Sequence, residues 1–294
     1  MENKFGQIKK GDFKMKKGLL KKVLASCLAL AMTFSIVACG NKEDKGTSSE
    51  SKTALTEIKD KGELVVGLSA DYAPYEFYTM VDGKKTIVGF DVELAKEIAK
   101  DLGVKLTLKE MKFDALLGAL PAGQIDMIIS GMNPDEERAK VIDFSDIYYT
   151  AQHGVLVNKK DLDKYKSVED LKSARVGAQM GSTQADIIKE KIKADNPTLL
   201  ANVNNLILEL KSGKIDALVT EKPVAEMAIK NNNELALSKI EFKDETGGNA
   251  VAVKKGEKEL VEQVNKTIKR LKDSGDLDKF IVDANELASK QIEK

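Results

Sequence analysis

The 294-residue sequence contains no tryptophan, one histidine and two cysteines. Its single histidine, His153, cannot form a histidine-rich metal cluster or a catalytic histidine pair, and we expect it to be structural. Both cysteines, Cys27 and Cys39, lie near the N-terminus, so the rest of the chain has neither a disulfide nor a thiol nucleophile. These absences argue against an enzyme that uses a thiol or a histidine pair, and no metal or cofactor is expected.

Arginine is scarce in this lysine-rich chain: of 47 Lys and Arg residues, only Arg138, Arg175 and Arg270 are arginines. An arginine in such a chain suggests a position that needs planar, bidentate geometry. The formal net charge is zero, and the N-terminal leader has an excess of lysine, so the rest of the chain is mildly acidic. Because no basic stripe with interleaved aromatic residues is present, the sequence argues against a nucleic-acid partner.

The N-terminus has the pattern of an export signal. Lysines precede the apolar residues 23–37, a segment that is short for a membrane-spanning helix. Residues 36–40, Ile-Val-Ala-Cys-Gly, resemble the lipobox of bacterial lipoproteins, in which the cysteine is acylated. We therefore predict a signal peptide over residues 1–38 and a lipid on Cys39, with an uncleaved N-terminal anchor as the alternative. Met15 is a second possible start of translation.

Residues 39–53 are polar and contain no bulky apolar side chain, which predicts a flexible tether. A diacylated cysteine would hold the protein firmly at the outer side of the cell membrane, where one acyl chain binds only marginally. The expected location is therefore extracytoplasmic and membrane-anchored.

An internal echo predicts two similar α/β units. Residues 123–130 are answered ninety positions later by residues 213–220, and residues 64–67 by residues 174–177. Alternating strands and helices predict mostly parallel sheets, whose ligands bind beyond the carboxyl ends of the strands.

The predicted units are two lobes. The first takes residues 54–150 and 247–294, and the second takes residues 151–246. Two crossings near residues 150–154 and 246–249 would join them, and Gly247-Gly248 suits a hinge. A long amphipathic helix is expected in the C-terminal part, with its apolar face formed by Leu260, Val261, Val264, Ile268 and Leu271.

One strand-to-helix turn is the main candidate site. The apolar residues 125–129 predict a buried strand, after which Asn133 is expected to cap a helix that begins at Pro134. Backbone N–H groups at Ser130 and Gly131, with Arg138 one turn into the helix, would suit a carboxylate ligand. The alternative is that Arg138 only pairs with its acidic neighbours at residues 135–137.

Three further turns carry aromatic or polar residues. After the first strand, Tyr72 is the candidate to stack on a ligand, whereas Tyr75 and Phe77 are expected to pack in the core. Asp91 is expected to cap the helix over residues 92–102, with ligand contact as the lesser alternative.

In the second unit, residues 179–184 precede a helix that buries Ile187, Ile188 and Ile192. Ser182 and Thr183 offer hydroxyl and N–H groups to a carboxylate, or simply cap the helix. Glu221 starts the following helix, either as dipole compensation or as the partner of a ligand ammonium group. A cation at Arg138 and an anion at Glu221 would complement an α-amino acid.

From about residue 54 to 294 the chain resembles the extracytoplasmic solute-binding proteins of polar amino-acid ABC transporters, solute-binding family 3. Residues 89–95, Gly-Phe-Asp-Val-Glu-Leu-Ala, match the family signature closely, and residues 72–77, 125–138 and 181–184 are also typical. The resemblance implies a two-lobed, type II periplasmic-binding-protein fold that closes around a free L-amino acid. It also implies an ABC permease and its ATPase as partners.

The resemblance also implies roles for residues at matching positions. Arg138 would hold the α-carboxylate with help from Ser130, Gly131, Asn133 and Thr183, and Glu221 would pair with the α-ammonium. Ser69, Tyr72, Phe113 and Gln179 would face the ligand side chain. The family more often has Asp at position 221, and binders of cationic amino acids commonly have an acid at the position of Ser69.

Two other functional classes compete with this interpretation. The same fold can host dehydratase activity on cyclic acids, but no nucleophile with an adjacent base is evident here. The sensor module of a signalling protein is the other rival, although no downstream spanning helix follows. We therefore expect a monomeric binding protein and not an enzyme.

Overall fold

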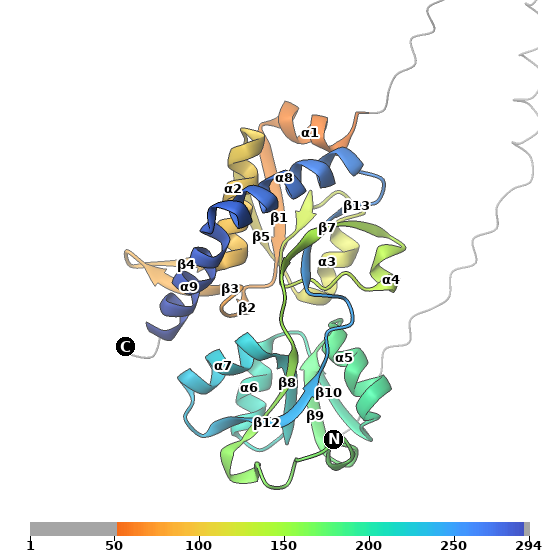
Figure 1. Cartoon of the computed structure of the whole chain (residues 1–294), viewed down its shortest axis with the longest axis vertical. Helices are drawn as coiled ribbons and strands as arrows, with labels where there is room; N and C mark the ends of the chain where they lie inside the picture. The colour runs from red at the N-terminus through yellow and green to blue at the C-terminus, as the bar shows by residue number, and fades with distance from the viewer. Residues whose placement is uncertain (1–51, 291–294) are drawn as a thin grey trace, which may run out of the picture. The chain divides into compact units, whose positions relative to one another are not determined.

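The computed structural model describes residues 52–290 (Figure 1). The predicted signal peptide, Cys39 and all but the end of the predicted tether lie outside these residues. Within the described part, no helix is both long enough and apolar enough to cross a membrane.

Two five-stranded sheets form the centres of two lobes (Figure 1). In lobe 1 the strands lie side by side in the order β5 (Lys105–Glu110), β1 (Glu63–Leu68), β6 (Met127–Ile128), β13 (Asn249–Lys254) and β7 (Ile142–Tyr149). In lobe 2 the order is β10 (Asn196–Leu200), β9 (Arg175–Gln179), β11 (Ala217–Glu221), β8 (His153–Asn158) and β12 (Leu235–Phe242).

Each sheet has one reversed strand. The strand β13 is antiparallel to both of its neighbours in lobe 1, and β8 is antiparallel to both of its neighbours in lobe 2. These are the strands that carry the chain into a lobe from the other one, so they begin at the edge where the neighbouring strands end. The sheets are therefore mixed, with the other strands running in one direction as predicted.

The helices of lobe 1 cover its sheet, and a small sheet lies beside it (Figure 1). The helices are α1 (Ala54–Lys61), α2 (Phe90–Leu102), α3 (Phe113–Ala119), α4 (Glu136–Ala139), α8 (Lys258–Ser274) and α9 (Asp276–Ser289). The small sheet contains β2 (Asp71–Tyr72), β3 (Glu76–Val81) and β4 (Lys84–Val88).

Lobe 2 contains short helices and helical turns beside its sheet. They are the 3-10 turns η1 (Lys159–Asp161) and η2 (Glu169–Leu171), α5 (Thr183–Ile187), the π-helical turn η3 (Ile188–Ile192), α6 (Val203–Lys211) and α7 (Lys222–Asn231). The predicted burial of Ile187, Ile188 and Ile192 is confirmed.

The predicted amphipathic helix is α8, which buries Leu260, Val264, Ile268 and Leu271 against lobe 1. Val261 is partly buried beside them. Residues spaced by three and four positions share one face of a helix, so this face joins the core while the lysine-rich face stays in solvent.

The internal echo has a packing reason. Gly67 in β1 faces Ile125 and Leu116, and a Cβ atom there would lie 2.5 Å from Ile125 Cδ1. In lobe 2, a Cβ atom on Gly177 would lie 2.7 Å from Ile215 Cδ1. Each strand therefore has a glycine at the point where the isoleucine of the echoed segment packs directly on its backbone.

The aspartates of the echo also have matching roles. Asp126 accepts a hydrogen bond from the Val65 N–H at 2.7 Å, and Asp216 accepts one from the Arg175 N–H at 2.9 Å. Each carboxylate thus satisfies a backbone N–H of the neighbouring strand, β1 or β9, which explains why Ile-Asp recurs at both places.

Two predicted helix starts are wrong. The helix expected to begin at Pro134 begins at Glu136, because the Asp135 side chain accepts the Arg138 N–H and so caps the helix in place of Asn133. Asp91 lies inside α2, whose N-cap is Gly89, and its carboxylate leaves the helix to contact Gly131 and Tyr148.

Two connections join the lobes, between β7 and β8 and between β12 and β13. The second contains Gly247 (φ 87°) and Gly248 (φ 137°), both in the region that favours glycine. A Cβ atom on Gly247 would meet nothing within 4 Å, whereas one on Gly248 would lie 2.7 Å from Ile147 Cγ2 and would also clash with the Tyr149 carbonyl oxygen.

We expect Gly248→Ala to lower the free energy of unfolding more than Gly247→Ala. Both alanines meet the backbone strain of positive φ, about 1–2 kcal/mol, but only the one at position 248 also collides with the end of β7, where the first connection begins. Urea unfolding of the two variants measures the difference. Equal losses of stability would show that the two connections do not pack as described.

Candidate functional site

A small cavity lies between the lobes. Lobe 1 contributes Ser69, Tyr72, Glu76, Phe113, Gly131 and Asn133 to its wall, and lobe 2 contributes Gln179, Ser182 and Gln184. Its volume is about 10 Å³, which is the space of one water molecule. An amino acid needs a larger space, so the lobes must separate before one can enter.

The wall contains seven of the eleven residues predicted from the sequence as ligand-binding: Ser69, Tyr72, Phe113, Gly131, Asn133, Gln179 and Ser182. The predicted core positions of Tyr75 and Phe77 are confirmed. The other four predicted residues, Ser130, Arg138, Thr183 and Glu221, lie just behind the wall and contact residues that line it. Sequence reasoning missed Glu76 and Gln184, although each lies within a segment that was singled out.

Arg138 is only 6% exposed and joins the two lobes. Its Nη1 donates to the Asn133 carbonyl oxygen at 2.7 Å, and its Nη2 donates to the Gly181 carbonyl oxygen of lobe 2 at 2.9 Å. Its Nε lies 2.9 Å from a carboxylate oxygen of Asp135, so the predicted pairing with an acidic neighbour is also present. The guanidinium carbon lies 5.7 Å from the centre of the Phe113 ring.

Because Gly181 lies in lobe 2, separation of the lobes releases Arg138 Nη2 while Asn133 and Asp135 continue to hold the rest of the guanidinium. Burial lowers the pKa of Arg138, and the charge of Asp135 opposes this shift. The side chain is therefore held in place with one donor that depends on lobe closure.

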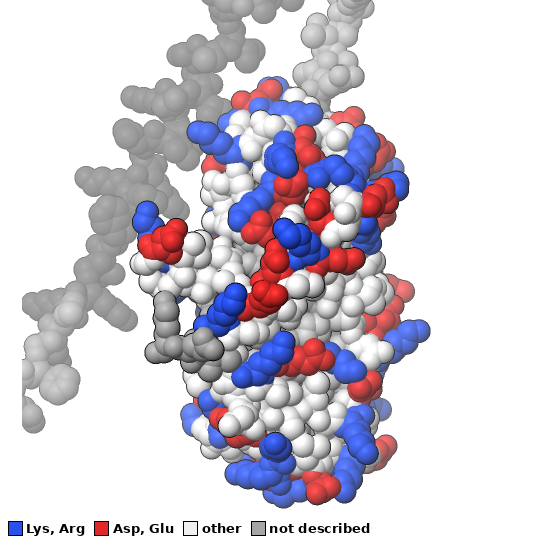
Figure 2. Space-filling model, turned by 60° about the vertical axis from the view of Figure 1, so that its left-hand side comes forward, with Lys and Arg blue, Asp and Glu red and all other residues white. Residues whose placement is uncertain are grey.

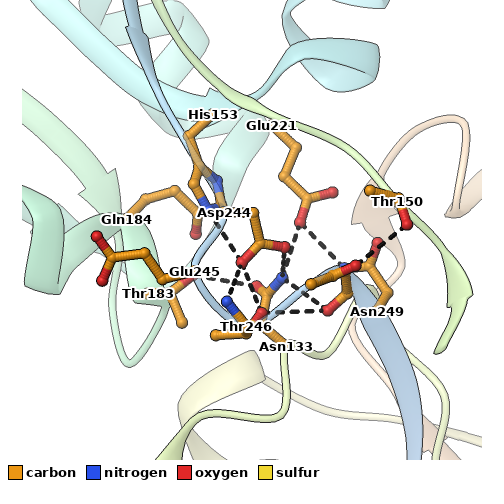
Figure 3. Close-up of polar contacts among 12 residues, drawn as sticks. Asn133, Thr150, His153, Thr183, Gln184, Glu221, Asp244, Glu245, Thr246 and Asn249 are labelled. Atoms are coloured by element: carbon orange, nitrogen blue, oxygen red, sulfur yellow. Dashed lines mark hydrogen bonds and ion pairs between the residues drawn. The ribbon is translucent and has the colours of Figure 1, made fainter. Parts of the chain in front are cut away.

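Asn133 links both ends of the site (Figure 3). Its Oδ1 accepts from the Thr183 hydroxyl at 3.0 Å, and its Nδ2 lies 3.3 Å from a carboxylate oxygen of Glu221. Thr183 and Glu221 belong to lobe 2, so this one amide contacts the opposite lobe on two sides. The backbone carbonyl of Asn133 also accepts a hydrogen bond from Arg138, so both the predicted cation, Arg138, and the predicted anion, Glu221, contact this residue.

Glu221 is 1% exposed, and its side-chain contacts are with lobe 1. Its carboxylate accepts from the Tyr75 hydroxyl, from Asn133, and from Asn249 Nδ2 at 3.0 Å. Burial raises the pKa of Glu221 to about 7, while hydrogen bonds from Tyr75, Asn249 and Asn133 oppose the shift. Glu221 is the N-cap residue of α7, but its side chain makes no capping hydrogen bond.

His153, the first residue of β8, and Asp244, on the second connection, lie near this group (Figure 3). The Gln184 amide contacts His153 Nδ1 at 3.1 Å, and His153 Nε2 lies 3.9 Å from Asp244. Burial lowers the pKa of His153, which favours the neutral ring. Among the described residues, no group of His, Cys, Asp and Glu side chains could hold a metal ion.

A buried pair of carboxyl groups, Glu76 and Asp91, lies behind Gly131. Glu76 accepts from the Ser130 hydroxyl at 2.5 Å, and Asp91 accepts from the Gly131 N–H at 2.8 Å and from the Tyr148 hydroxyl at 2.9 Å. The predicted N–H donor of Gly131 is thus occupied by Asp91. Both carboxyl groups are fully buried, and within residues 52–290 neither forms an ion pair with a basic side chain.

Burial raises the pKa of Glu76 well above its ordinary value, and the neighbouring Asp91 raises it further. Burial also raises the pKa of Asp91 to about 6, although hydrogen bonds from Gly131, Tyr148 and Glu76 oppose the shift. Glu76 is therefore the member of the pair that keeps a proton. The wall of the cavity therefore carries a carboxyl group, Glu76, whose ionisation would place a second negative charge beside that of buried Asp91.

On the face of the molecule in Figure 2, basic and acidic residues are interspersed without a continuous basic surface.

We expect Glu221→Gln to flatten the pH dependence of stability. The folded protein holds the Glu221 proton to about pH 7, above the ordinary value of 4.5, so the free energy of unfolding falls as pH rises through this range. The glutamine variant cannot lose this proton, and its stability should fall less over the same range. Urea unfolding at several pH values tests this, with Glu226→Gln on the exposed face of α7 as control. An unchanged slope in Glu221→Gln would contradict the expectation.

Comparison with known proteins places this geometry in a family. The sequence model of the bacterial extracellular solute-binding proteins, family 3, matches residues 64–283. The arginine-binding extracellular protein ArtP of Bacillus subtilis is 38% identical over 267 residues, which cover 89% of this chain and 96% of ArtP. The glutamine-binding protein GlnH of the same organism is 35% identical over 270 residues, with the same coverage.

Among solved structures, an amino-acid ABC transporter substrate-binding protein, AbpA of Streptococcus pneumoniae, bound to L-arginine, is 47% identical, with a TM-score of 0.77. The match covers 79% of this chain and 98% of AbpA. An ancestral amino-acid-binding protein described as a precursor of cyclohexadienyl dehydratase is 36% identical, with a TM-score of 0.70, and covers 78% of this chain and 97% of that protein. This chain, with its two lobes and the cavity between them, belongs to the bacterial extracellular solute-binding proteins, family 3.

Proposed function

We propose that this protein captures a free L-amino acid between its lobes and delivers it to an ABC permease, and that L-arginine is the favoured ligand. The observation that carries the proposal is the cavity itself, which is lined from both lobes, has the buried carboxyl of Glu76 in its wall, and includes Asn133, whose carbonyl oxygen accepts from Arg138. Relatives are named as binding proteins for arginine, glutamine and cystine, and one as a probable histidine-binding protein, so the family alone does not choose among amino acids.

In this proposal the ligand carboxylate binds Arg138 and Thr183. When the lobes separate, Arg138 Nη2 loses the Gly181 carbonyl and Thr183 loses Asn133, so two donors become free together. A carboxylate can accept from both donors as the lobes close again. Ser130, Gly131, Asn133 and Ser182 would form the surrounding wall.

The ligand ammonium would pair with Glu221. In the closed arrangement this carboxyl is buried among neutral donors, and burial raises its pKa because no basic side chain within residues 52–290 is paired with it. An ammonium group would supply that cation and favour the ionised form. Asn133 contacts Glu221 on one side and Arg138 on the other, which matches the short span of a zwitterionic head group.

For the ligand side chain we favour a cation. Tyr72, Phe113, Ser69 and Gln179 line the cavity, and the aromatic rings suit a planar guanidinium. Glu76 supplies a buried carboxyl on the same wall, so the acid that Ser69 lacks is available from a different position. A guanidinium would replace the proton on the Glu76–Asp91 pair.

The remaining parts of the proposal concern the whole protein. We propose lobe boundaries at residues 54–150 with 247–294, and at residues 151–246, in keeping with the membership of the two sheets. We also propose that a lipid on Cys39 holds the monomeric protein at the outer side of the cell membrane, next to its permease and ATPase.

We propose a binding role and not an enzymatic one, although one relative is a precursor of a dehydratase. Glu76 could act as an acid, but within residues 52–290 no base or nucleophile is arranged beside it, and Asp91 is held by Gly131 and Tyr148. Calorimetry with a panel of amino acids separates the two roles: stoichiometric heat without product supports binding, and product formation supports the enzyme.

We expect Arg138→Ala to weaken amino-acid binding by about 2–5 kcal/mol, because a buried ionic hydrogen-bond partner of the ligand is removed. Arg175→Ala is the control, since Arg175 forms a partly exposed ion pair with Asp216 at 2.6 Å in lobe 2. Titration calorimetry measures both. Affinity near that of the wild type in Arg138→Ala would rule out the assignment of the carboxylate site.

We expect Glu76→Gln to lower the affinity for L-arginine at least about tenfold, because an ionic hydrogen bond is lost. The affinity for L-citrulline should change much less. Citrulline has nearly the same shape as arginine and the same zwitterionic head group, but its side chain is uncharged, so the comparison separates charge pairing from a general loss of structure. Glu226→Gln on α7 is the matched control. Equal losses for both ligands would show that Glu76 only supports the fold.

A further inference from the structure

Asp71 belongs to lobe 1, but its carboxylate reaches lobe 2. Its Oδ2 accepts from the Val203 N–H at 2.7 Å, and Gln179 Nε2 lies 3.4 Å from its Oδ1. The Ser69 hydroxyl donates to Oδ1 at 2.8 Å from the same lobe. Asp71 is 5% exposed, so it makes these contacts in a buried setting.

Val203 is the first residue of α6, a nine-residue helix of lobe 2. The first N–H groups of a helix have no partner within it, and they carry partial positive charge. Asn202 caps this helix from within lobe 2 by accepting the Asn205 N–H at 3.1 Å. The Val203 N–H remains, and the carboxylate that satisfies it comes from the opposite lobe.

The same residue connects both walls of the ligand cavity. Ser69 lines the cavity from lobe 1, and Gln179 lines it from lobe 2. Both side chains contact Asp71, which does not line the cavity itself. Asp71 can therefore link lobe closure to the positions of both wall residues without contacting the ligand.

We propose that Asp71 is a positioning residue that stabilises the closed lobes by capping helix α6 across the cleft, and thereby sets the affinity for every amino acid that the protein binds. The inference rests on the proposed capture of a ligand between the lobes. When the lobes separate, the Val203 N–H and the Asp71 carboxylate lose each other and must be solvated by water. Closure restores an ionic hydrogen bond at a positive helix end, so its free energy adds to that of the ligand contacts.

The expected signature is a uniform loss of affinity. Asp71→Ala should raise the dissociation constants of L-arginine and L-citrulline by similar factors, about tenfold to a hundredfold, as expected for loss of an ionic hydrogen bond. Asp71→Asn keeps an acceptor oxygen without the charge and should recover part of the loss. Because the contact holds the closed state, the change should lie mainly in the dissociation rate.

Removal of the donor tests the same contact from the other lobe. Val203→Pro deletes the N–H at the first position of a helix, where proline is tolerated, and Asn202 already has an extended backbone that suits a following proline. The double variant Asp71→Ala with Val203→Pro should bind amino acids no more weakly than whichever single variant has the lower affinity. The matched control is Asp126→Ala, which removes a carboxylate that accepts the Val65 N–H at 2.7 Å within lobe 1. This control should lower stability and leave the affinity of the folded protein near the wild-type value.

Surface plasmon resonance and calorimetry on the full chain give the rates and affinities. The proposal is overturned if citrulline binds Asp71→Ala as tightly as the wild type, because Asp71 would then act only on a cationic ligand. It is also overturned if the effects of the two substitutions add fully. Failure of the wild-type protein to bind any amino acid would instead refute the proposed function.

Discussion

Ionisable side chains that are buried between the lobes have hydrogen-bond partners in the opposite lobe, and the closed structure depends on these contacts. Arg138 donates to Gly181, Asp71 accepts from Val203, and Glu221 accepts from Tyr75 and Asn249. Removing a charge from water costs several kcal/mol unless such partners replace the water. Lobe closure and the satisfaction of these charges are therefore one event.

Because of this coupling, the charges of the ligand affect the buried acidic groups of the closed structure. Within residues 52–290, Glu221 has neutral donors and no basic partner, and burial without a basic partner raises the pKa of both Glu76 and Asp91. A ligand that brings an ammonium and a guanidinium would neutralise both acidic groups. A neutral side chain would satisfy only the first, which is the physical reason to favour arginine over glutamine.

Much of this could be predicted from the sequence because it depends on local patterns. The echo around Asp126 and Asp216 indicated two similar units, and the spacing in α8 indicated its buried face. The scarcity of arginine pointed to Arg138, which the structure buries between the lobes.

The features that were missed depend on partners distant in sequence. Asp91 was expected to be an N-cap, but its carboxylate contacts Gly131, forty residues away. The Asn133-Pro134 pair has the composition of a helix start, yet Asp135 caps the helix because its side chain reaches the Arg138 N–H. Glu76 was overlooked beside the aromatic residues of its segment, since only the folded chain brings it to the cavity.

The reversed strands have a consequence for the order in which the molecule can be assembled. The five strands of lobe 2 lie in one uninterrupted stretch, from His153 to Phe242. The sheet of lobe 1 instead needs β13 between β6 and β7, and β13 begins only at Asn249. A chain that folds from its N-terminus as it emerges can thus complete lobe 2 first, while the first half of lobe 1 still lacks the strand that joins β6 to β7.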